Sequence, residues 1–168
     1  MNHGKIRLLL VALCIGFTAC TSDDDDENST ANLLIGYWEV THFEDHGTDT
    51  YTDADGKKVV NNYGENREIT SQADEEYAVC SFGLTSCMII ATGDPDFAFE
   101  LNKPCPYKIN GTKLSCPLFS GDYSDHCTIK TLTATTLELE YNEEGTDSEG
   151  TYPIHEVYYK RLVMKRIN

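Results

Sequence analysis

The chain has 168 residues, and its 13 lysines and arginines against 28 aspartates and glutamates give a formal net charge of −15 at neutral pH. This length predicts one domain. The acidity argues against a partner that is nucleic acid or an anionic membrane surface, since both would repel the chain. Ten tyrosines and many Thr, Val and Ile residues favour strands over helices.

The first segment, residues 1–19, has the three parts of a secretion signal. Lys5 and Arg7 give it a positive start, and residues 8–17 form an unbroken apolar run. That run is too short to cross a bilayer as a helix, which needs about 20 residues. Thr18 and Ala19 are the small residues that a signal peptidase requires, and residues 21–30 contain no apolar residue that could continue a core helix. We therefore expect residues 1–19 to be removed on export.

The end of this segment, Phe17-Thr18-Ala19-Cys20, resembles a bacterial lipobox. The resemblance implies that Cys20 becomes the lipidated N-terminus and anchors the protein to the membrane, because each buried CH₂ of its acyl chains contributes about 0.8 kcal/mol. Residues 20–31 would then be the lipidated cysteine and an acidic, flexible linker. The acidic run is similar to the export tag of surface lipoproteins in Bacteroidetes. We expect a lipid-anchored protein of the outer membrane, exposed on the cell surface, with the periplasmic face as the alternative.

Residues 32–168 are predicted to be the folded domain. Residues 53–56 form the predicted tip of a hairpin, and residues 73–77 could form a short helix. The clearest two-residue period lies where Leu137, Leu139 and Tyr141 alternate with glutamates. Many short strands with frequent turn signals predict an antiparallel sandwich or barrel. The predicted strands are residues 33–43, 48–52, 57–63, 67–71, 77–82, 87–92, 97–101, 105–110, 112–118, 125–131, 136–141 and 155–165.

Cysteine spacing around one turn predicts a cross-strand disulfide, which export would permit. Asn110-Gly111 is the strongest two-residue hairpin signal in the chain, and counting outward from it pairs Cys105 with Cys116. Facing residues on antiparallel strands lie close enough for a disulfide.

A second pairing follows from the same count at another turn. If Gly83-Leu84 is the centre of a two-residue turn, Cys80 faces Cys87. Cys127 is left over and is predicted to be a buried thiol. The cysteines include no C-x-x-C pair, which argues against a zinc site.

Both ends of the domain resemble lipocalins, and the layout is similar to the lipocalin-like domain of Bacteroidetes lipoproteins. The resemblance rests on Gly36-Tyr37-Trp38, on residues 129–141 and on the aromatic-basic stretch at residues 158–161. It implies an all-β, up-and-down barrel of about eight to ten strands, closed at one end by Gly36 and Trp38. In lipocalins a basic residue of the last strand packs on the tryptophan ring as a cation–π contact. The resemblance assigns that role to Arg161, with Lys160 as the other choice.

Candidate catalytic and metal sites have simpler explanations. His42, Glu44 and His46 would share one face of a strand, but we expect the strand to end near His46 and Gly47, so a polar barrel rim is the better interpretation. Asp125-His126-Cys127 suggests a thiol nucleophile, yet consecutive strand residues point to opposite faces. We therefore expect no catalytic residues, no metal and no cofactor, and a protein that is not an enzyme.

Two functions are consistent with these features of the sequence. The first is an envelope lipoprotein whose barrel binds a small hydrophobic or amphipathic ligand, since barrels of about eight strands can hold one small ligand. This expectation rests on the family resemblance. The second is a structural or surface-interaction module whose barrel is filled by its own side chains. In both, the membrane is reached through Cys20, and the ligand-binding residues stay undefined.

Overall fold

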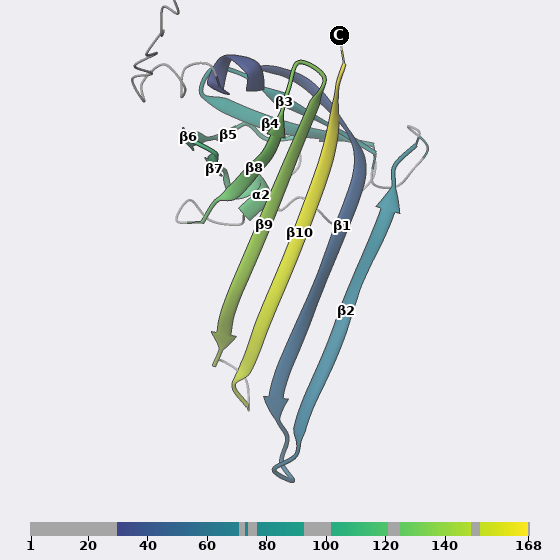
Figure 1. Cartoon of the computed structure of the whole chain (residues 1–168), viewed down its shortest axis with the longest axis vertical. Coiled ribbons are helices and arrows are strands. Elements are labelled where there is room, and N and C mark those ends of the chain that lie inside the picture. Colours follow the sequence, from purple (N-terminus) through teal and green to yellow (C-terminus); the bar gives the residue numbers. More distant parts are fainter. Residues whose placement is uncertain are drawn as a thin grey trace, which may run out of the picture.

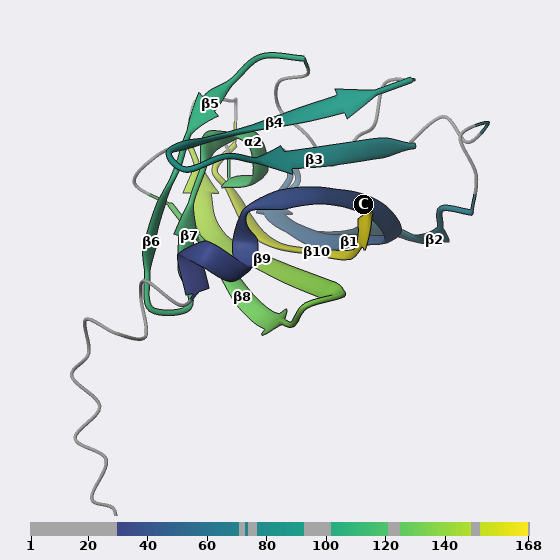
Figure 2. The same ribbon diagram turned by 90° about the horizontal axis from the view of Figure 1, so that it is seen from above.

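The structure is a computed structural model, and it describes residues 30–70, 73, 77–92, 102–120, 125–148 and 152–167. Ten strands form one antiparallel sheet that curls into a nearly closed barrel (Figure 1; Figure 2). This confirms the predicted all-β antiparallel barrel of eight to ten strands. The predicted secretion signal, Cys20 and the strand predicted at residues 97–101 lie outside the described residues.

The hydrogen-bonded order of the strands is β5-β4-β3-β1-β10-β9-β8-β7-β6, and β2 pairs with β1. A helical turn at residues 30–34 precedes β1, where the sequence predicted the first strand to have begun already. The elements are β1 (Gly36–Thr52), β2 (Lys58–Glu68), β3 (Ala78–Phe82), β4 (Ser86–Ala91), β5 (Cys105–Pro106), β6 (Lys108–Asn110), β7 (Lys113–Ser115), α2 (Pro117–Ser120), β8 (Cys127–Leu132), β9 (Thr136–Asp147) and β10 (Ile154–Ile167).

Strand β1 changes partner along its length. Its first four residues pair with β3, and from His42 onward it pairs with β2, while β10 follows it on the other side throughout. A bulge between Val40 and His42 marks the change, and bulges bend a strand and increase its twist. The bulged Thr41 donates its hydroxyl to the Val163 carbonyl (3.1 Å), and its own carbonyl accepts the Ile69 N–H.

Beyond this bulge, β2, β1, β10 and β9 continue past the barrel as a four-stranded sheet (Figure 1). We call this part the projecting sheet; it comprises residues 44–52, 58–66, 142–147 and 154–161. The prediction that the first strand ends near His46 and Gly47 is wrong, and the strand predicted at residues 136–141 continues as β9 to Asp147. These segments are polar on both faces, so no hydrophobic alternation marks them as strands.

The barrel interior is one hydrophobic cluster. Leu137, Leu139 and Tyr141 all point into it, which confirms the alternation seen in the sequence. Trp38 is fully buried, as the resemblance implied, and its indole Nε1 donates to the Leu34 carbonyl in the helical turn (2.8 Å). The other largest fully buried side chains are Phe43, Phe119, Leu34, Ile89, Leu114, Leu118, Leu137, Leu139, Leu162 and Met164.

Both predicted hairpin registers are wrong, and in the same way. In β6–β7 Asn110 pairs with Lys113, so the turn is Gly111-Thr112 with Gly111 at a φ of +59°. A type II′ turn needs its glycine at this first central position. In β3–β4 the turn is Leu84-Thr85, because the Gly83 N–H donates to the Ser86 carbonyl (2.8 Å).

The two register errors remove the geometry that paired Cys105 with Cys116 and Cys80 with Cys87. Each residue's partner lies two positions further along the second strand than predicted, so Cys80 faces Ile89. A shift by two residues keeps every side chain on its face of the sheet. The cysteines therefore still point inward, and all five described cysteines are buried thiols.

Candidate functional site

The cation on Trp38 is Arg166, not Arg161. The Arg166 guanidinium lies 4.2 Å from the centre of the Trp38 ring, and it donates hydrogen bonds to the Ile35 carbonyl (2.8 Å) and to the Leu33 carbonyl. Register explains the correction: β1–β10 pairing sets Trp38 opposite Arg166. Arg161 lies five residues earlier, and an odd separation puts it on the other face of β10.

Gly36 has a steric reason to be glycine in this arrangement. Its φ is +140°, a conformation that other residues rarely adopt. A Cβ at this position would also collide with the Arg166 guanidinium. Gly36 thus leaves the space through which Arg166 reaches the backbone carbonyls and the Trp38 ring.

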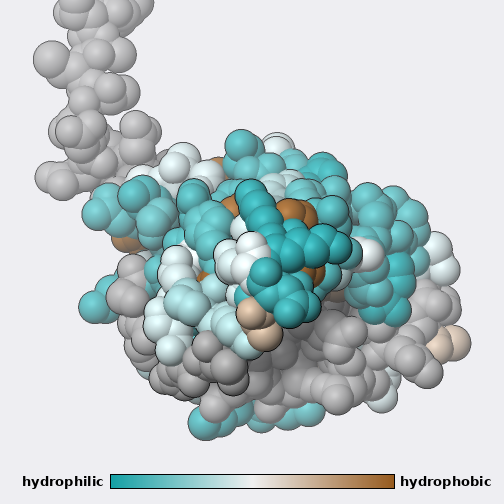
Figure 3. Space-filling model, turned by 90° about the horizontal axis from the view of Figure 1, so that it is seen from below, coloured by the Kyte–Doolittle hydropathy of each residue, from teal (hydrophilic) through white to brown (hydrophobic). Residues whose placement is uncertain are grey.

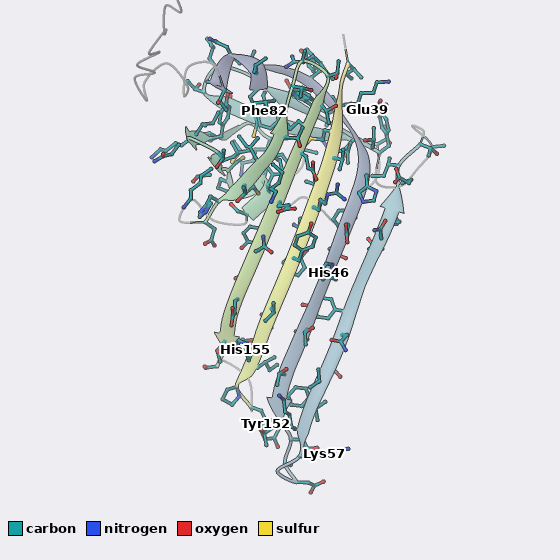
Figure 4. All side chains as sticks on the ribbon, in the orientation of Figure 1. Glu39, His46, Lys57, Phe82, Tyr152 and His155 are labelled. Atoms are coloured by element: carbon teal, nitrogen blue, oxygen red, sulfur yellow. The ribbon has the colours of Figure 1, made fainter. Side chains whose placement is uncertain are left out.

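Strand pairing divides the projecting sheet into two faces. We call inner the face that continues the barrel interior, on which Asp45, Tyr158 and Lys160 lie, and outer the opposite face, on which Glu44, His46 and Tyr159 lie. Figure 4 labels His46 midway along the projecting sheet and His155 near its free end. Seen from that free end, the surface is mostly hydrophilic (Figure 3).

On the inner face, polar groups gather around the buried side chain of Lys160. Lys160 is 3 % exposed, and its ammonium lies 5.8 Å from the centre of the Tyr158 ring. Burial lowers the pKa of Lys160, and electrostatic interactions with the acidic groups of Cys127, Asp45 and Glu143 oppose that effect. The neutral form of Lys160 is therefore less costly to bury here than the ammonium.

The tyrosines beside Lys160 have carboxylate partners. The Tyr158 hydroxyl donates to Asp45 (3.4 Å), and the Tyr141 hydroxyl donates to Glu143 (2.8 Å). Burial, followed by these carboxylates, raises the pKa of both tyrosines. The phenols thus stay protonated and act as hydrogen-bond donors to the carboxylates.

The outer face carries an aromatic pair and a set of ion pairs. The His46 and Tyr159 rings lie 4.6 Å apart at an angle of 31°, and the Tyr159 hydroxyl donates to Glu140 (3.3 Å). Arg161 donates to Glu138 (2.7 Å) and lies 3.7 Å from Glu44. These contacts hold the Arg161 side chain against the sheet, where 33 % of it is exposed. The His46 side chain is 58 % exposed and is therefore the more accessible group on the outer face.

Two hollows flank His46. One, of about 490 Å³, lies over β1 and β2, and the other, of about 420 Å³, lies over β1, β9 and β10. Gly64 pairs with His46 and has no side chain, which opens the first hollow between Asn62 and Asn66. The second is lined by His46, Gly47, Thr48, Asn142, Glu143, Glu144, Val157, Tyr158 and Tyr159.

The predicted rim residues His42, Glu44 and His46 do share one face, with the Glu44 carboxylate 3.9 Å from His42 and 3.8 Å from His46. They lie on the outer face of the sheet rather than at its end. In the described part of the chain no group of three or more His, Cys, Asp or Glu side chains is arranged to hold a metal ion. Burial raises the pKa of Cys127 to about 12, so this thiol is no nucleophile at neutral pH.

Sequence reasoning missed the hollows and the projecting sheet. A signal was present: Gly47 and Gly64 each interrupt a polar segment, and glycine inside a strand often marks a close approach of neighbouring groups. The Tyr63 ring in fact lies over Gly47, where a Cβ would collide with it. Recognising the pair required the register of β1 and β2, which the sequence does not give.

No helix in the described ranges is long and apolar enough to cross a membrane. Comparisons of the chain with protein-family models, with curated proteins and with solved structures give no match.

Proposed function

We propose that this protein is a lipid-anchored surface-interaction module of the cell envelope, in which a filled barrel supports the projecting sheet and a partner binds the outer face around His46. The most direct support comes from where the structure is packed with side chains and where it has hollows. The barrel interior is packed with side chains, whereas both described hollows lie on the projecting sheet.

The packing favours this function over a ligand held inside the barrel. Trp38, Phe43 and Phe119 are fully buried in the cluster, and Phe82 stacks on Phe119 with ring centres 6.1 Å apart. Binding sites for small molecules are usually preformed concave spaces lined by apolar groups. A hydrophobic ligand in this barrel would have to displace side chains that already contact one another.

The partner is expected to be polar and either uncharged or basic. Glu144, Asn142 and Thr48 line one hollow with the aromatic pair, and Glu44, Asn62 and Asn66 line the other. These groups offer carboxylate and amide oxygens and rings with polar edges. An anionic partner would meet the repulsion of a chain with a net charge of −15.

Anchoring at Cys20 is part of the proposal, and the lipobox resemblance supports it. The acidic residues after Cys20 would hold the domain away from the membrane, because like charges extend a linker. Replacing Cys20 by alanine should leave the protein unacylated and in the aqueous phase of a detergent partition. Acyl labelling of Cys20→Ala equal to that of the wild type would contradict the anchor.

Photo-crosslinking in cells of the producing bacterium tests the binding face. A photoreactive amino acid replaces His46 or, as a matched control on the barrel, the 83 % exposed Leu84. We expect a discrete crosslinked species from position 46 and none from position 84. The same protein is titrated with a hydrophobic fluorophore as a probe of the barrel. Stoichiometric fluorophore binding without a crosslink at position 46 would overturn the proposal in favour of a barrel ligand.

A further inference from the structure

Three buried cysteines meet at one point inside the barrel. The Cys116 sulfur lies 3.1 Å from the Cys87 sulfur, and it also has a hydrogen bond with the Cys105 side chain. Cys87 and Cys105 face each other in the β4–β5 pairing. The three residues come from three separate segments of the chain, so only the folded barrel brings the sulfurs together.

This point lies at the seam of the barrel. The strand order begins at β5 and ends at β6, so the barrel closes where these two edges approach. Cys87 belongs to β4, which is next to the first edge, and Cys116 follows β7, which is next to the other. A bond between these two sulfurs would join the two sides of the seam.

We propose that Cys87 and Cys116 form a disulfide in the exported protein and that this bond fastens the barrel across its seam. An S–S bond is about 2.05 Å long, so the sulfurs must approach by about 1 Å, a movement within the reach of χ1 rotations. The physiological part of this inference rests on the proposed export, whereas the pairing itself rests on the geometry.

The geometry favours this pair over the pairs expected from the sequence. Cys80 lies opposite Ile89 and is displaced from Cys87 by two residues along the strand. Cys105 is the second neighbour of Cys116, but it lies on the two-residue strand β5, to which the Cys87 backbone already pairs. A Cys87–Cys116 bond joins β4 to the segment after β7, which no described strand pairing connects directly, and these two sulfurs already lie 3.1 Å apart.

Joining the two thiols requires an oxidant that itself carries a disulfide, either a thiol–disulfide oxidoreductase or a small-molecule disulfide. The Cys116 thiolate attacks the oxidant and forms a mixed disulfide while one oxidant sulfur leaves as a thiol. Cys87 then loses its proton and attacks the Cys116 sulfur, releasing the second oxidant sulfur as a thiol. Two protein thiols become one disulfide, and the oxidant gains two electrons and two protons.

The surroundings of Cys116 suit it to the first attack. Its pKa is lowered by the hydrogen bond from Cys87, against the effect of burial, with further donation from the Leu118 N–H and Cys105. Cys116 also precedes α2, whose Phe119 and Ser120 N–H groups bond to its carbonyl. Thiolate is the attacking form of cysteine. Because the three sulfurs are buried in the closed barrel, the oxidant must reach them before the seam closes.

Peptide mapping without reduction tests the pairing. The full chain is produced in a reducing cytosol, unfolded, and refolded with oxidised glutathione, so the result does not depend on export. Trypsin with chymotrypsin separates all five cysteines of the domain, since Phe82, Lys108 and Phe119 are among the cleavage sites between them. We expect a linked peptide pair that contains Cys87 and Cys116. A dominant link between any other two cysteines, or none, would overturn the inference.

Stability variants provide a second readout. Closing a loop of this length should raise the Tm of the oxidised over the reduced wild type by about 10 °C. Cys87→Ala should abolish that difference, whereas Cys105→Ala and Cys127→Ala, which also remove buried thiols, should keep it. A difference that survives in Cys87→Ala and disappears in Cys105→Ala would show that Cys105 is the partner of Cys116. The same mapping of protein isolated from the envelope then tests export separately.

Discussion

Arg166 holds Trp38 at the barrel end through its ring contact and two backbone carbonyls. We expect Arg166→Ala to lower the free energy of unfolding by about 2–4 kcal/mol, the sum of a cation–π contact and charged hydrogen bonds. Arg161→Ala is the matched control and should cost less than about 1 kcal/mol, because its ion pairs are partly exposed. Urea unfolding followed by Trp38, the single tryptophan of the chain, measures both. The reverse order of the two costs would restore Arg161 to the role implied by the lipocalin resemblance.

Glu138 should make stability depend on pH in acid. Its burial raises the pKa, but hydrogen bonds from Arg161 and Thr131 outweigh that effect, and the net pKa is lowered. A carboxylate with a lowered folded-state pKa stabilises the protein above its ordinary pKa of about 4.3, and this stabilisation is lost as the pH falls further.

We therefore expect Glu138→Gln to flatten the decline of stability below pH about 4.3. Urea midpoints measured from neutral pH into acid give the slope. An acid limb of Glu138→Gln as steep as that of the wild type would contradict this account.

Strand β9 shows which elements could be predicted from the sequence and which could not. Its first half alternates Leu137, Leu139 and Tyr141 with polar residues, since one face meets the core. Its second half, from Asn142 onward, is exposed on both faces and carries no such period.

The hairpin turns were recognised as turns, but their centres were misplaced by one residue. Turn position depends on which loop residue takes the positive φ, and Gly111 can serve either position.

Tyr63 is expected to hold the projecting sheet together locally. Its ring covers Gly47, its direct partner across β1 and β2, and a good cross-strand pair contributes up to about 1 kcal/mol. In Tyr63→Ala the amides of β2 should exchange hydrogen about fivefold faster. Val60→Ala, an exposed change on the same strand, is the control. Exchange that stays at the wild-type rate in Tyr63→Ala would show that the ring contributes nothing to this sheet.

At the scale of the whole molecule, the sequence indicated a barrel but not its two-part form. A hydrophobic pattern in the sequence marks only the faces that become buried, so Trp38, Leu137 and Leu139 could be predicted to lie in the core. The projecting sheet is stabilised by backbone pairing along β1 and β10. This pairing does not require a hydrophobic pattern in the side chains, so the sequence did not indicate it. The sequence also could not predict that Cys87, Cys105 and Cys116 come together, because their contact depends on how the two edges of the sheet approach each other.

The barrel is expected to fold without the free end of the projecting sheet. A shortened chain joins Thr48 to Asn62 and Glu144 to Val157, each through Asn-Gly, in place of residues 49–61 and 145–156. Both junctions connect residues that already pair across neighbouring strands, and a two-residue Asn-Gly turn suits such a pair.

The described residues of the two removed segments are mostly exposed and lie outside the hydrophobic cluster. The free energy of unfolding should therefore change by no more than about 1 kcal/mol, as surface changes usually do. Trp38 should keep the emission of a buried indole, and the crosslink at position 46 should persist, because His46 and Tyr159 remain in place. If the shortened chain unfolds at much lower urea, the projecting sheet is a structural part of the barrel. If it stays folded but loses the crosslink, the partner also needs the removed end.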